Sequence, residues 1–175
     1  VTEKMLGPTH PNTMILVSNL GSAIRQQGRV AESRPYYERV LETNLKLNGP
    51  DHFLSVSAES NLSQLLREVG DIAGAERHAR NSIAHLEKAF PPGHPARAIF
   101  IDALARVLIS AAKYAEAETA LDQAYALFIA SPGFGPNHSR TREVVEDYVK
   151  LYKAWNKPES EAKWQKTLGA IPASH

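Results

Sequence analysis

Gly7-Pro8-Thr9-His10-Pro11 is the stretch that decides the fold, because the chain returns to it three more times. The later copies read Gly49-Pro50-Asp51-His52-Phe53, Pro91-Pro92-Gly93-His94-Pro95 and Gly135-Pro136-Asn137-His138-Ser139. Their histidines follow at intervals of 42, 42 and 44 residues, and a two-residue insertion in the loop 131–136 accounts for the longer interval. A fixed period of this length is typical of repeat architectures built from small helical units.

Two further landmarks keep the same period. Asn19-Leu20-Gly21 aligns with Asn61-Leu62-Ser63 and Ala103-Leu104-Ala105, and the triplet that begins at Gly28 aligns with those that begin at Gly70 and Ala112. Five positions after these last three residues stand the small residues Ser33, Ala75 and Ala117. Shared spacing of several landmarks predicts one array over residues 1–175, with repeats at about 8–48, 50–90, 92–132 and 136–170.

Each repeat is predicted to be a pair of helices. The residue before each turn histidine is Thr9, Asp51, Gly93 or Asn137, and all four types are favoured as N-caps. Proline then occupies the first turn in two repeats, and glycine ends the first helix in two repeats. The predicted helices span residues 10–27, 31–47, 52–69, 73–89, 95–111, 115–130, 139–155 and 158–168.

Apolar residues recur at helical spacing along the first helices. They are Leu16, Leu20, Ala23 and Ile24 in the first repeat, and Ala58, Leu62, Leu65 and Leu66 in the second. A single helix pair cannot bury such a stripe, whereas stacked pairs bury it as a continuous core. The sequence therefore predicts an all-α fold, a right-handed α-solenoid of about four helix-turn-helix repeats, with the first helices lining the concave face.

Composition excludes several classes of protein. The 175 residues include 20 basic and 19 acidic ones, so the net charge of +1 gives no general attraction to nucleic acid or anionic lipid. There are no cysteines, which excludes disulfides and zinc–thiolate sites. No stretch approaches the ~18 apolar residues of a membrane span, and no secretory signal is visible, so we expect a cytoplasmic protein without a membrane partner.

The landmark residues of the first repeat resemble those of the tetratricopeptide repeat. Those residues are Asn19, Leu20, Gly21, Ile24, Gly28, Ser33, Tyr37 and Val40. The 42-residue period and the turn from Leu6 to Pro11 resemble the kinesin light chain variety, which is also widespread in bacterial proteins. The chain departs from the pattern at Ala112, which replaces a turn glycine, and at Asp147-Tyr148-Val149, which replaces Asn-Leu-Gly.

The resemblance implies a scaffold for protein–protein interaction that binds an extended peptide or a partner protein in its concave groove. The family's groove positions correspond here to Ser18, Asn19, Ser22, Arg25 and Gln26; to Ser60, Asn61, Gln64, Arg67 and Glu68; to Asp102, Arg106, Ile109 and Ser110; and to Glu146, Lys150 and Lys153.

Basic residues recur among these groove positions. Arg25 and Arg67 are one period apart, and Arg106 and Lys150 lie one helical turn earlier in the register. Together they could form a basic ladder that recognises an acidic peptide or a C-terminal carboxylate. The alternative is an ordinary solvated helix face, because Glu68, Asp102, Glu143 and Glu146 dilute the positive charge.

A second reading is a regulatory or docking segment of a larger enzyme. The segment 151–159 resembles the end of repeat arrays that follow bacterial serine/threonine kinase domains. Residues 1–6 read like the tail of a preceding second helix, so we expect a fragment of a longer protein. Apolar surface left at the ends of the array suggests possible self-association.

No catalytic or metal-binding constellation stands out. The turn histidines are one repeat apart and cannot converge on one ion, so we assign them a role at the helix starts. His78 and His85 are seven residues apart on one helix and could share a face, but no acidic third ligand is implied, so we expect them at the surface. The Gly-rich loop 131–136 lacks the phosphate-binding pattern. The sequence thus predicts no enzyme, no cofactor, no metal and no nucleic-acid partner.

Overall fold

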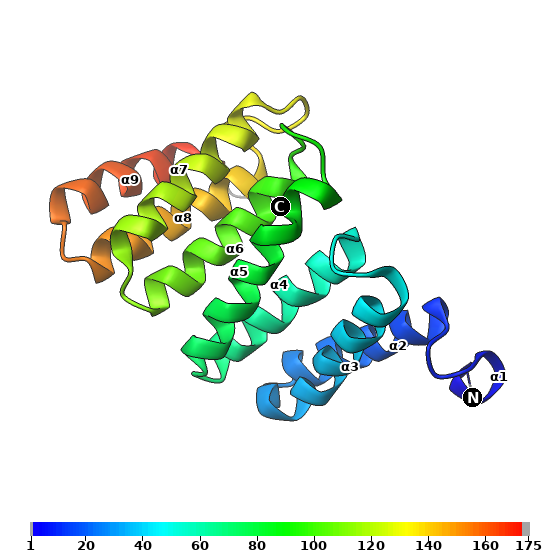
Figure 1. Ribbon diagram of the computed structural model, residues 1–175. Helices are drawn as coiled ribbons and strands as arrows, with labels where there is room; N and C mark the ends of the chain where they lie inside the picture. Colours follow the sequence, from blue (N-terminus) through cyan, green and yellow to red (C-terminus); the bar gives the residue numbers. More distant parts are fainter. Residues whose placement is uncertain (1, 173–175) are drawn as a thin grey trace. The chain divides into compact units, whose positions relative to one another are not determined.

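The computed structural model describes residues 2–172, and all regular structure within that range is helical (Figure 1). The helices found there are α1 (Thr2–Leu6), α2 (Pro11–Gln26), α3 (Val30–Asn48), α4 (Phe53–Glu68), α5 (Ile72–Ala89), α6 (Ala96–Ser110), α7 (Tyr114–Ala130), α8 (Ser139–Ala154) and α9 (Pro158–Ala170). The eight helices predicted from the sequence are confirmed, each to within two residues at either end. The short α1 is the segment expected to be the tail of a second helix.

The helices form two compact units. The first unit ends at Ala89 and contains α1–α5, and the second begins at Phe90 and contains α6–α9. Within the first unit, every helix packs on the next one in the chain. The second unit follows the same rule, and α6 also contacts α8 there. Each unit is therefore built from sequential helix pairs.

Each helix pair reverses direction at a residue in the left-handed conformation. The φ angle is 79° at Gly28, 85° at Gly70, 57° at Ala112 and 56° at Asn156. In all four turns the N–H of the following residue donates to the carbonyl five positions back, at 3.2, 2.9, 2.9 and 2.9 Å respectively. This is the Schellman arrangement that commonly ends helices. Glycine adopts it without strain, asparagine tolerates it, and alanine is disfavoured there.

The turn histidines begin the first helices. The Nδ1 atoms of His10, His52, His94 and His138 accept an N–H from the residue two positions on, at 3.2, 3.2, 3.1 and 3.1 Å. Each imidazole thereby satisfies one of the free N–H groups at a helix start. The expected helix-start role is confirmed, but our assignment of Thr9, Asp51, Gly93 and Asn137 as N-caps is wrong. The acceptor is the ring nitrogen Nδ1, so the N–H proton of each neutral imidazole must lie on the other nitrogen, Nε2.

Small residues allow the helices of a pair to approach closely. Ser33, Ala75 and Ala117 are completely buried. A Cβ atom added to Gly21 would lie 2.9 Å from Cβ of Tyr36, so a larger residue would force the helices apart. Second-helix small residues at the repeat period are thus core positions, as their spacing predicts.

The prediction of a buried stripe fails on α2. Leu16 and Leu20 are about half exposed, although the matching residues of α4 are buried. The two helices differ in their neighbours: α4 packs between two long helices, α3 and α5, whereas α2 packs on α3 and on the five-residue α1. The short α1 covers too little of α2 to bury Leu16 and Leu20.

The left-handed turns predict opposite effects of exchanging glycine and alanine. Ala112→Gly should raise the free energy of unfolding by about 1 kcal/mol because it relieves the positive-φ strain. Gly70→Ala should lower it by about the same amount, and since no atom lies within 4 Å of the added Cβ, the effect is conformational only. Urea unfolding followed by circular dichroism measures both. A loss of stability in Ala112→Gly would contradict this account.

The histidine caps predict a modest dependence on the side-chain acceptor. His52→Ala should lower the free energy of unfolding by about 1 kcal/mol, because the N–H of Leu54 loses its acceptor. His52→Asn should retain most of the stability, since asparagine is a favoured N-cap. Equal losses in the two variants, measured by thermal unfolding, would show that ring packing rather than capping matters at this position.

Candidate functional site

The predicted groove residues of the first unit lie on its first helices, α2 and α4. Ser18, Asn19 and Asn61 line a common cavity. Further along α2, the hydroxyl of Ser22 is hydrogen-bonded to that of Tyr37 at 3.3 Å. Gln26 is exposed, whereas Ser60 is buried and does not form part of an open surface. The structure thus brings together only some of the predicted residues.

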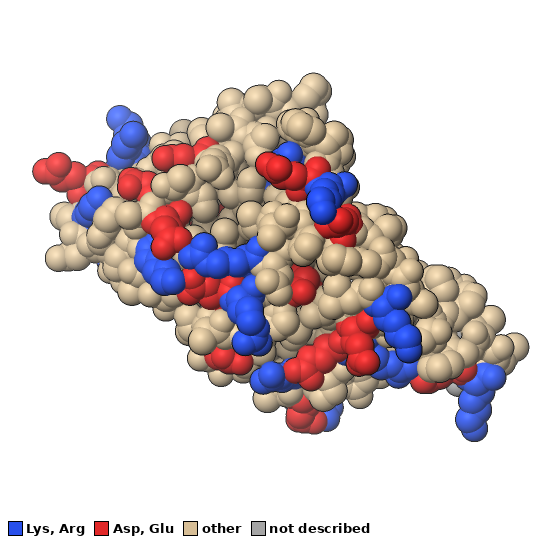
Figure 2. All heavy atoms as spheres, viewed as in Figure 1, with Lys and Arg blue, Asp and Glu red and all other residues tan. Residues whose placement is uncertain are grey.

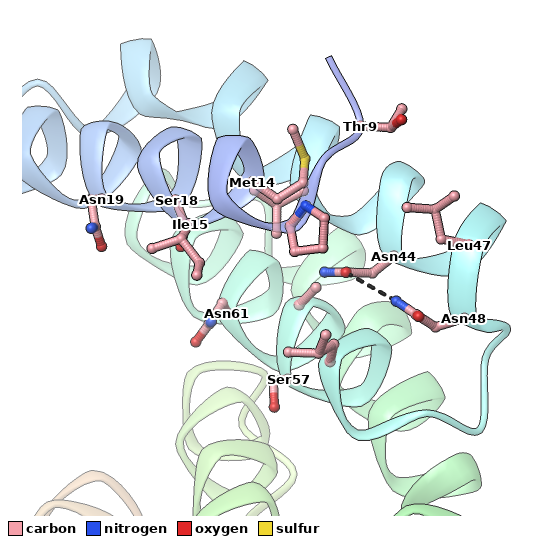
Figure 3. Close-up of a pocket in the computed structure, with 14 residues that line it drawn as sticks. Thr9, Met14, Ile15, Ser18, Asn19, Asn44, Leu47, Asn48, Ser57 and Asn61 are labelled. Atoms are coloured by element: carbon pink, nitrogen blue, oxygen red, sulfur yellow. Dashed lines mark hydrogen bonds between the residues drawn. The ribbon is translucent and has the colours of Figure 1, made fainter. Parts of the chain in front are cut away.

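The cavity has a volume of about 330 Å³ and lies between α2, α3 and α4 (Figure 3). It is lined by Thr9, Pro11, Met14, Ile15, Ser18, Asn19, Val40, Asn44, Leu47, Asn48, Leu54, Ser57, Ala58 and Asn61. The volume is at the lower end of the range of small-ligand sites. The α3 residues of this lining are not among the predicted groove positions, which all lie on first helices.

The cavity lining is apolar and amide-rich, and it contains no charged residue. The amides of Asn44 and Asn48 are hydrogen-bonded to each other at 3.4 Å. Asn19 and Asn61, one period apart, are exposed, and neither amide has a hydrogen-bond partner within residues 2–172. A side-chain amide offers both a donor and an acceptor, which is what an extended backbone requires.

Arg25 is held by Glu68 across the first helices of the first unit. Its Nε donates to a carboxylate oxygen at 2.8 Å, and a second guanidinium N–H donates to the other oxygen. This hydrogen bonding raises the pKa of Arg25 and lowers that of Glu68. Arg67, the other predicted basic residue of this unit, donates to Gln64 at 3.3 Å. Figure 2 shows the same general pattern, with basic and acidic side chains lying beside each other rather than in separate patches.

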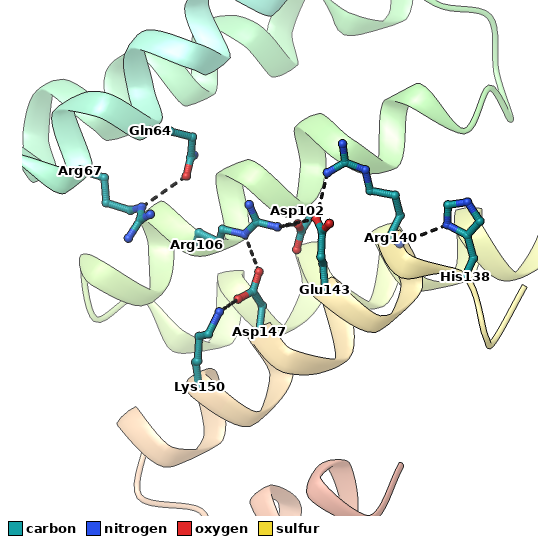
Figure 4. Close-up of polar contacts among 9 residues, drawn as sticks. All are labelled: Gln64, Arg67, Asp102, Arg106, His138, Arg140, Glu143, Asp147 and Lys150. Atoms are coloured by element: carbon teal, nitrogen blue, oxygen red, sulfur yellow. Dashed lines mark hydrogen bonds and ion pairs between the residues drawn. The ribbon is translucent and has the colours of Figure 1, made fainter. Parts of the chain in front are cut away.

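Arg106 is surrounded by carboxylates in the second unit (Figure 4). Its guanidinium donates to Asp102 and Asp147, and a third carboxylate, on Glu143, lies 3.6 Å away. Lys150 donates to the other oxygen of Asp147 at 2.5 Å. Arg106 and Lys150 are thus brought together, as predicted, but around an acid that neutralises them. Lys153 is exposed.

Asp102 is the most perturbed group of this cluster. Its side chain is buried, and its Oδ1 atom has no hydrogen-bond partner in the described structure. Burial raises the pKa of Asp102 to about 7; Arg106 opposes this shift, and the charges of Asp147 and Glu143 add to it. A carboxyl in such surroundings is expensive to ionise.

Of the two α5 histidines expected at the surface, His78 is mostly buried whereas His85 is about one-third exposed, and each pairs with an acidic side chain. Nδ1 of His78 lies 2.5 Å from Oε2 of the buried Glu59, and Nδ1 of His85 lies 2.6 Å from Oδ1 of Asp51. The expectation fails for His78 because its acidic partner, Glu59, lies on α4 and not on α5 itself; the partner of His85, Asp51, lies in the turn before α4. Within residues 2–172, no group of three or more His, Asp or Glu side chains is placed to hold a metal ion. No helix there has both the length and the apolar character needed to cross a bilayer.

The buried carboxyl predicts a pH-dependent effect of Asp102→Asn. The folded chain keeps the Asp102 proton up to about pH 7, whereas the unfolded chain loses it near 3.8, so this group's contribution to stability falls as the pH rises between those values. The introduced amide cannot ionise, and its oxygen can still accept from Arg106. The stability of the variant relative to the parent should therefore increase between pH 4.5 and 8, by an amount on the order of 3 kcal/mol.

Urea unfolding at both pH values measures this difference. Glu143→Gln is the comparison variant: it removes a half-exposed carboxylate of the same cluster, which contributes less than burial to the raised pKa of Asp102, so it should change the pH profile less than Asp102→Asn does. Parallel pH profiles of Asp102→Asn and the parent would contradict the assignment.

Comparison with known proteins identifies the architecture. The sequence profile of the tetratricopeptide repeat matches residues 12–88 and 56–130. No curated protein sequence gives a significant match. Two crystal structures of a Podosopora anserina protein, described as a kinesin light chain with nearly identical TPR-like repeats, are similar to this chain. One of them is a single-substitution variant.

The variant has a TM-score of 0.79 at 20% identity, over 97% of this chain and 79% of that one. The second structure has a TM-score of 0.75 at 20% identity, over 97% and 80%. BtubC (BKLC) from P. vanneervenii has a TM-score of 0.74 at 15% identity, over 93% of this chain and 66% of that one. At these identities the likeness concerns the fold alone. Since the two profile matches together cover more than half of the sequence, the chain belongs to the tetratricopeptide repeat family, and its structural neighbours are repeat proteins of the kinesin light chain type.

Proposed function

We propose that this chain binds an extended segment of a partner protein over the cavity between α2, α3 and α4. Tetratricopeptide repeats are in general modules for protein–protein interaction. The observation that carries the proposal is the pair Asn19 and Asn61, whose equivalent amides flank an uncharged, mostly apolar cavity and have no partner in residues 2–172. An extended backbone bound to these amides would place one apolar side chain in the cavity.

The second part of the proposal concerns charge. Arg25 follows Asn19 by six residues on α2, which is a rise of about 9 Å along a helix. An extended peptide covers this distance in about three residues. We therefore propose a segment in which an apolar residue is followed, about three positions later, by an acidic side chain or the C-terminal carboxylate. That carboxylate would compete with Glu68 for Arg25, and Arg67 is the second basic residue at this end of the first helices.

A random dodecapeptide display library selected on the intact chain tests both parts. Enriched peptides should share the apolar residue and the carboxylate at this spacing. Asn61→Ala should weaken their binding at least tenfold, because two hydrogen bonds to the peptide backbone are lost, each worth about 1 kcal/mol. Arg25→Glu combined with Arg67→Glu should abolish the preference for the carboxylate. Fluorescence anisotropy of the labelled peptides measures both effects.

Asn81→Ala provides the matched control for the amide. Asn81 is an exposed asparagine on α5, outside the cavity. Peptides that bind all variants equally, or that lose binding equally in Asn61→Ala and Asn81→Ala, would count against the site. Circular dichroism of each variant establishes that it is folded.

A further inference from the structure

Asn48 breaks the apolar pattern of the residues that precede the turns between repeats. Leu6, Phe90 and Phe134 stand at its position in the other repeats. In the second repeat this position holds an asparagine that is followed by Gly49, and Asn-Gly occurs nowhere else in the 175 residues. A polar exception at an otherwise apolar position indicates a local function rather than a packing role.

The structure places Asn48 at the end of α3 and in the wall of the peptide cavity (Figure 3). The residue is exposed, and its amide nitrogen donates to Oδ1 of Asn44 at 3.4 Å. A hydrogen bond of this length is weak, so the amide is held loosely. Since no charged residue lines the cavity, a charge formed at Asn48 would change the character of the whole site.

Gly49 leaves its own main-chain nitrogen open to approach. Its φ is 78°, and no atom lies within 4 Å of the place where a Cβ would stand. Without a side chain on this residue, the nitrogen can come close to Cγ of Asn48. One bond opposes the approach, because the N–H of Gly49 donates to the carbonyl of Leu45 at 3.1 Å. This bond closes the last turn of α3, where helices fray, so it can open without unfolding of the unit.

The two neighbouring groups can react with each other and with water alone. The nitrogen of Gly49 loses its proton and attacks Cγ of Asn48, and the amide NH2 leaves as ammonia with that proton while a cyclic succinimide forms. Water then adds to either carbonyl carbon of the ring and breaks the C–N bond there, which gives aspartate or isoaspartate at this position. In sum, one water molecule is consumed and one ammonia is released, and no atom is oxidised or reduced. An uncharged amide is thereby exchanged for a carboxylate.

We propose that Asn48 is a site of spontaneous deamidation, and that the carboxylate formed there releases the partner segment from the cavity; the second half rests on the proposed function. The aspartate product places a negative charge beside Oδ1 of Asn44 and beside the apolar side chain of the partner. The isoaspartate product lengthens the main chain before Gly49, so the N–H of Gly49 no longer reaches the carbonyl that ends α3. Both products weaken the site.

Occupation of the cavity regulates the reaction in turn. A bound segment covers Asn48 and holds the last turn of α3 closed, so the nitrogen of Gly49 stays bonded to Leu45. The reaction is therefore slower in the complex than in the free chain. An empty cavity loses its affinity with time, whereas an occupied cavity keeps it.

Tryptic peptide mapping of the intact, folded chain tests the first half. The chain is kept at 37 °C without ligand, and the tryptic fragment 47–67 contains both Asn48 and Asn61, so Asn61, followed by Leu62, is the control within one peptide. The mass should rise by the exchange of NH2 for OH at Asn48 only, and faster at pH 8 than at pH 6, because the attacking nitrogen must lose its proton. Asn48→Gln should abolish the gain, since attack on the longer side chain must close a larger and less favoured ring.

The same chain unfolded in urea gives the reference rate. An Asn48 that is still intact in the folded chain when the unfolded chain has been converted would overturn the proposal. An equal mass gain at Asn61 would also overturn it, because the reaction would then not depend on the Asn-Gly pair.

Fluorescence anisotropy of the peptides selected on the parent chain tests the second half. Asn48→Asp should weaken their binding roughly three- to tenfold, the size expected for one charge at a partly exposed site. Asn48→Gln, which stays uncharged, should bind like the parent, and so should Asn81→Asp, which adds the same charge on α5 outside the cavity. A saturating peptide should slow the mass gain at Asn48 of the parent.

The outcomes separate this proposal from the peptide site itself. Equal binding by Asn48→Asp and the parent would overturn the regulatory half and leave the peptide site standing. If the parent selects no peptide, the proposed function fails and takes the regulatory half with it, while the mass gain at Asn48 still decides the modification.

Discussion

A single left-handed residue per helix pair is the constraint on which the rest of each unit depends. Gly28, Gly70, Ala112 and Asn156 reverse the chain with the same hydrogen bond back to the fifth preceding carbonyl. An identical reversal gives identical registers, so residues one period apart occupy equivalent places on successive first helices. This is why Asn19 and Asn61 face one cavity although they are 42 residues apart. The chemistry of the candidate site thus rests on the backbone geometry of turns that contribute no side chain to it.

The same register explains the ion pairs. Arg25 and Glu68 are 43 residues apart, and Arg106 and Asp147 are 41 apart, so each pair joins neighbouring first helices at nearly equivalent positions. Such separations place opposite charges beside each other. Most basic residues of the predicted ladder are therefore paired with acids and largely neutralised. The two pairs differ in burial: Arg25 and Glu68 are both about 30% exposed, whereas Asp147 is almost fully buried. A ligand carboxylate can therefore displace Glu68 from Arg25 at little cost. It cannot easily displace Asp147 from Arg106, because a buried carboxylate left without its cationic partner is strongly destabilising.

Periodicity predicted the helices because the signals that end them are local: a glycine, a proline or a capping residue acts within a turn or two. It failed where the outcome depends on a neighbour. The exposure of Leu16 is decided by what lies beside α2, and the pairing of His78 by Glu59 on another helix. The N-cap prediction fails for a different reason: histidine is not among the usual N-cap residues, whereas the residue before it is of a favoured type in every repeat. Two signals could have helped, namely the strict recurrence of the histidine itself and opposite charges separated by about one period.

The two walls of the cavity differ in how firmly neighbouring helices hold them. One wall of the cavity carries Asn61 on α4, which is packed between α3 and α5, and the other carries Asn19 on α2, which has a full-length neighbour on one side only. Binding is strongest when both walls are already in place, because ordering a wall on binding consumes part of the interaction energy. A ligand that bridges Asn19 and Asn61 therefore gains less net free energy than two rigid walls would give it, because part of that energy goes into holding α2 in place.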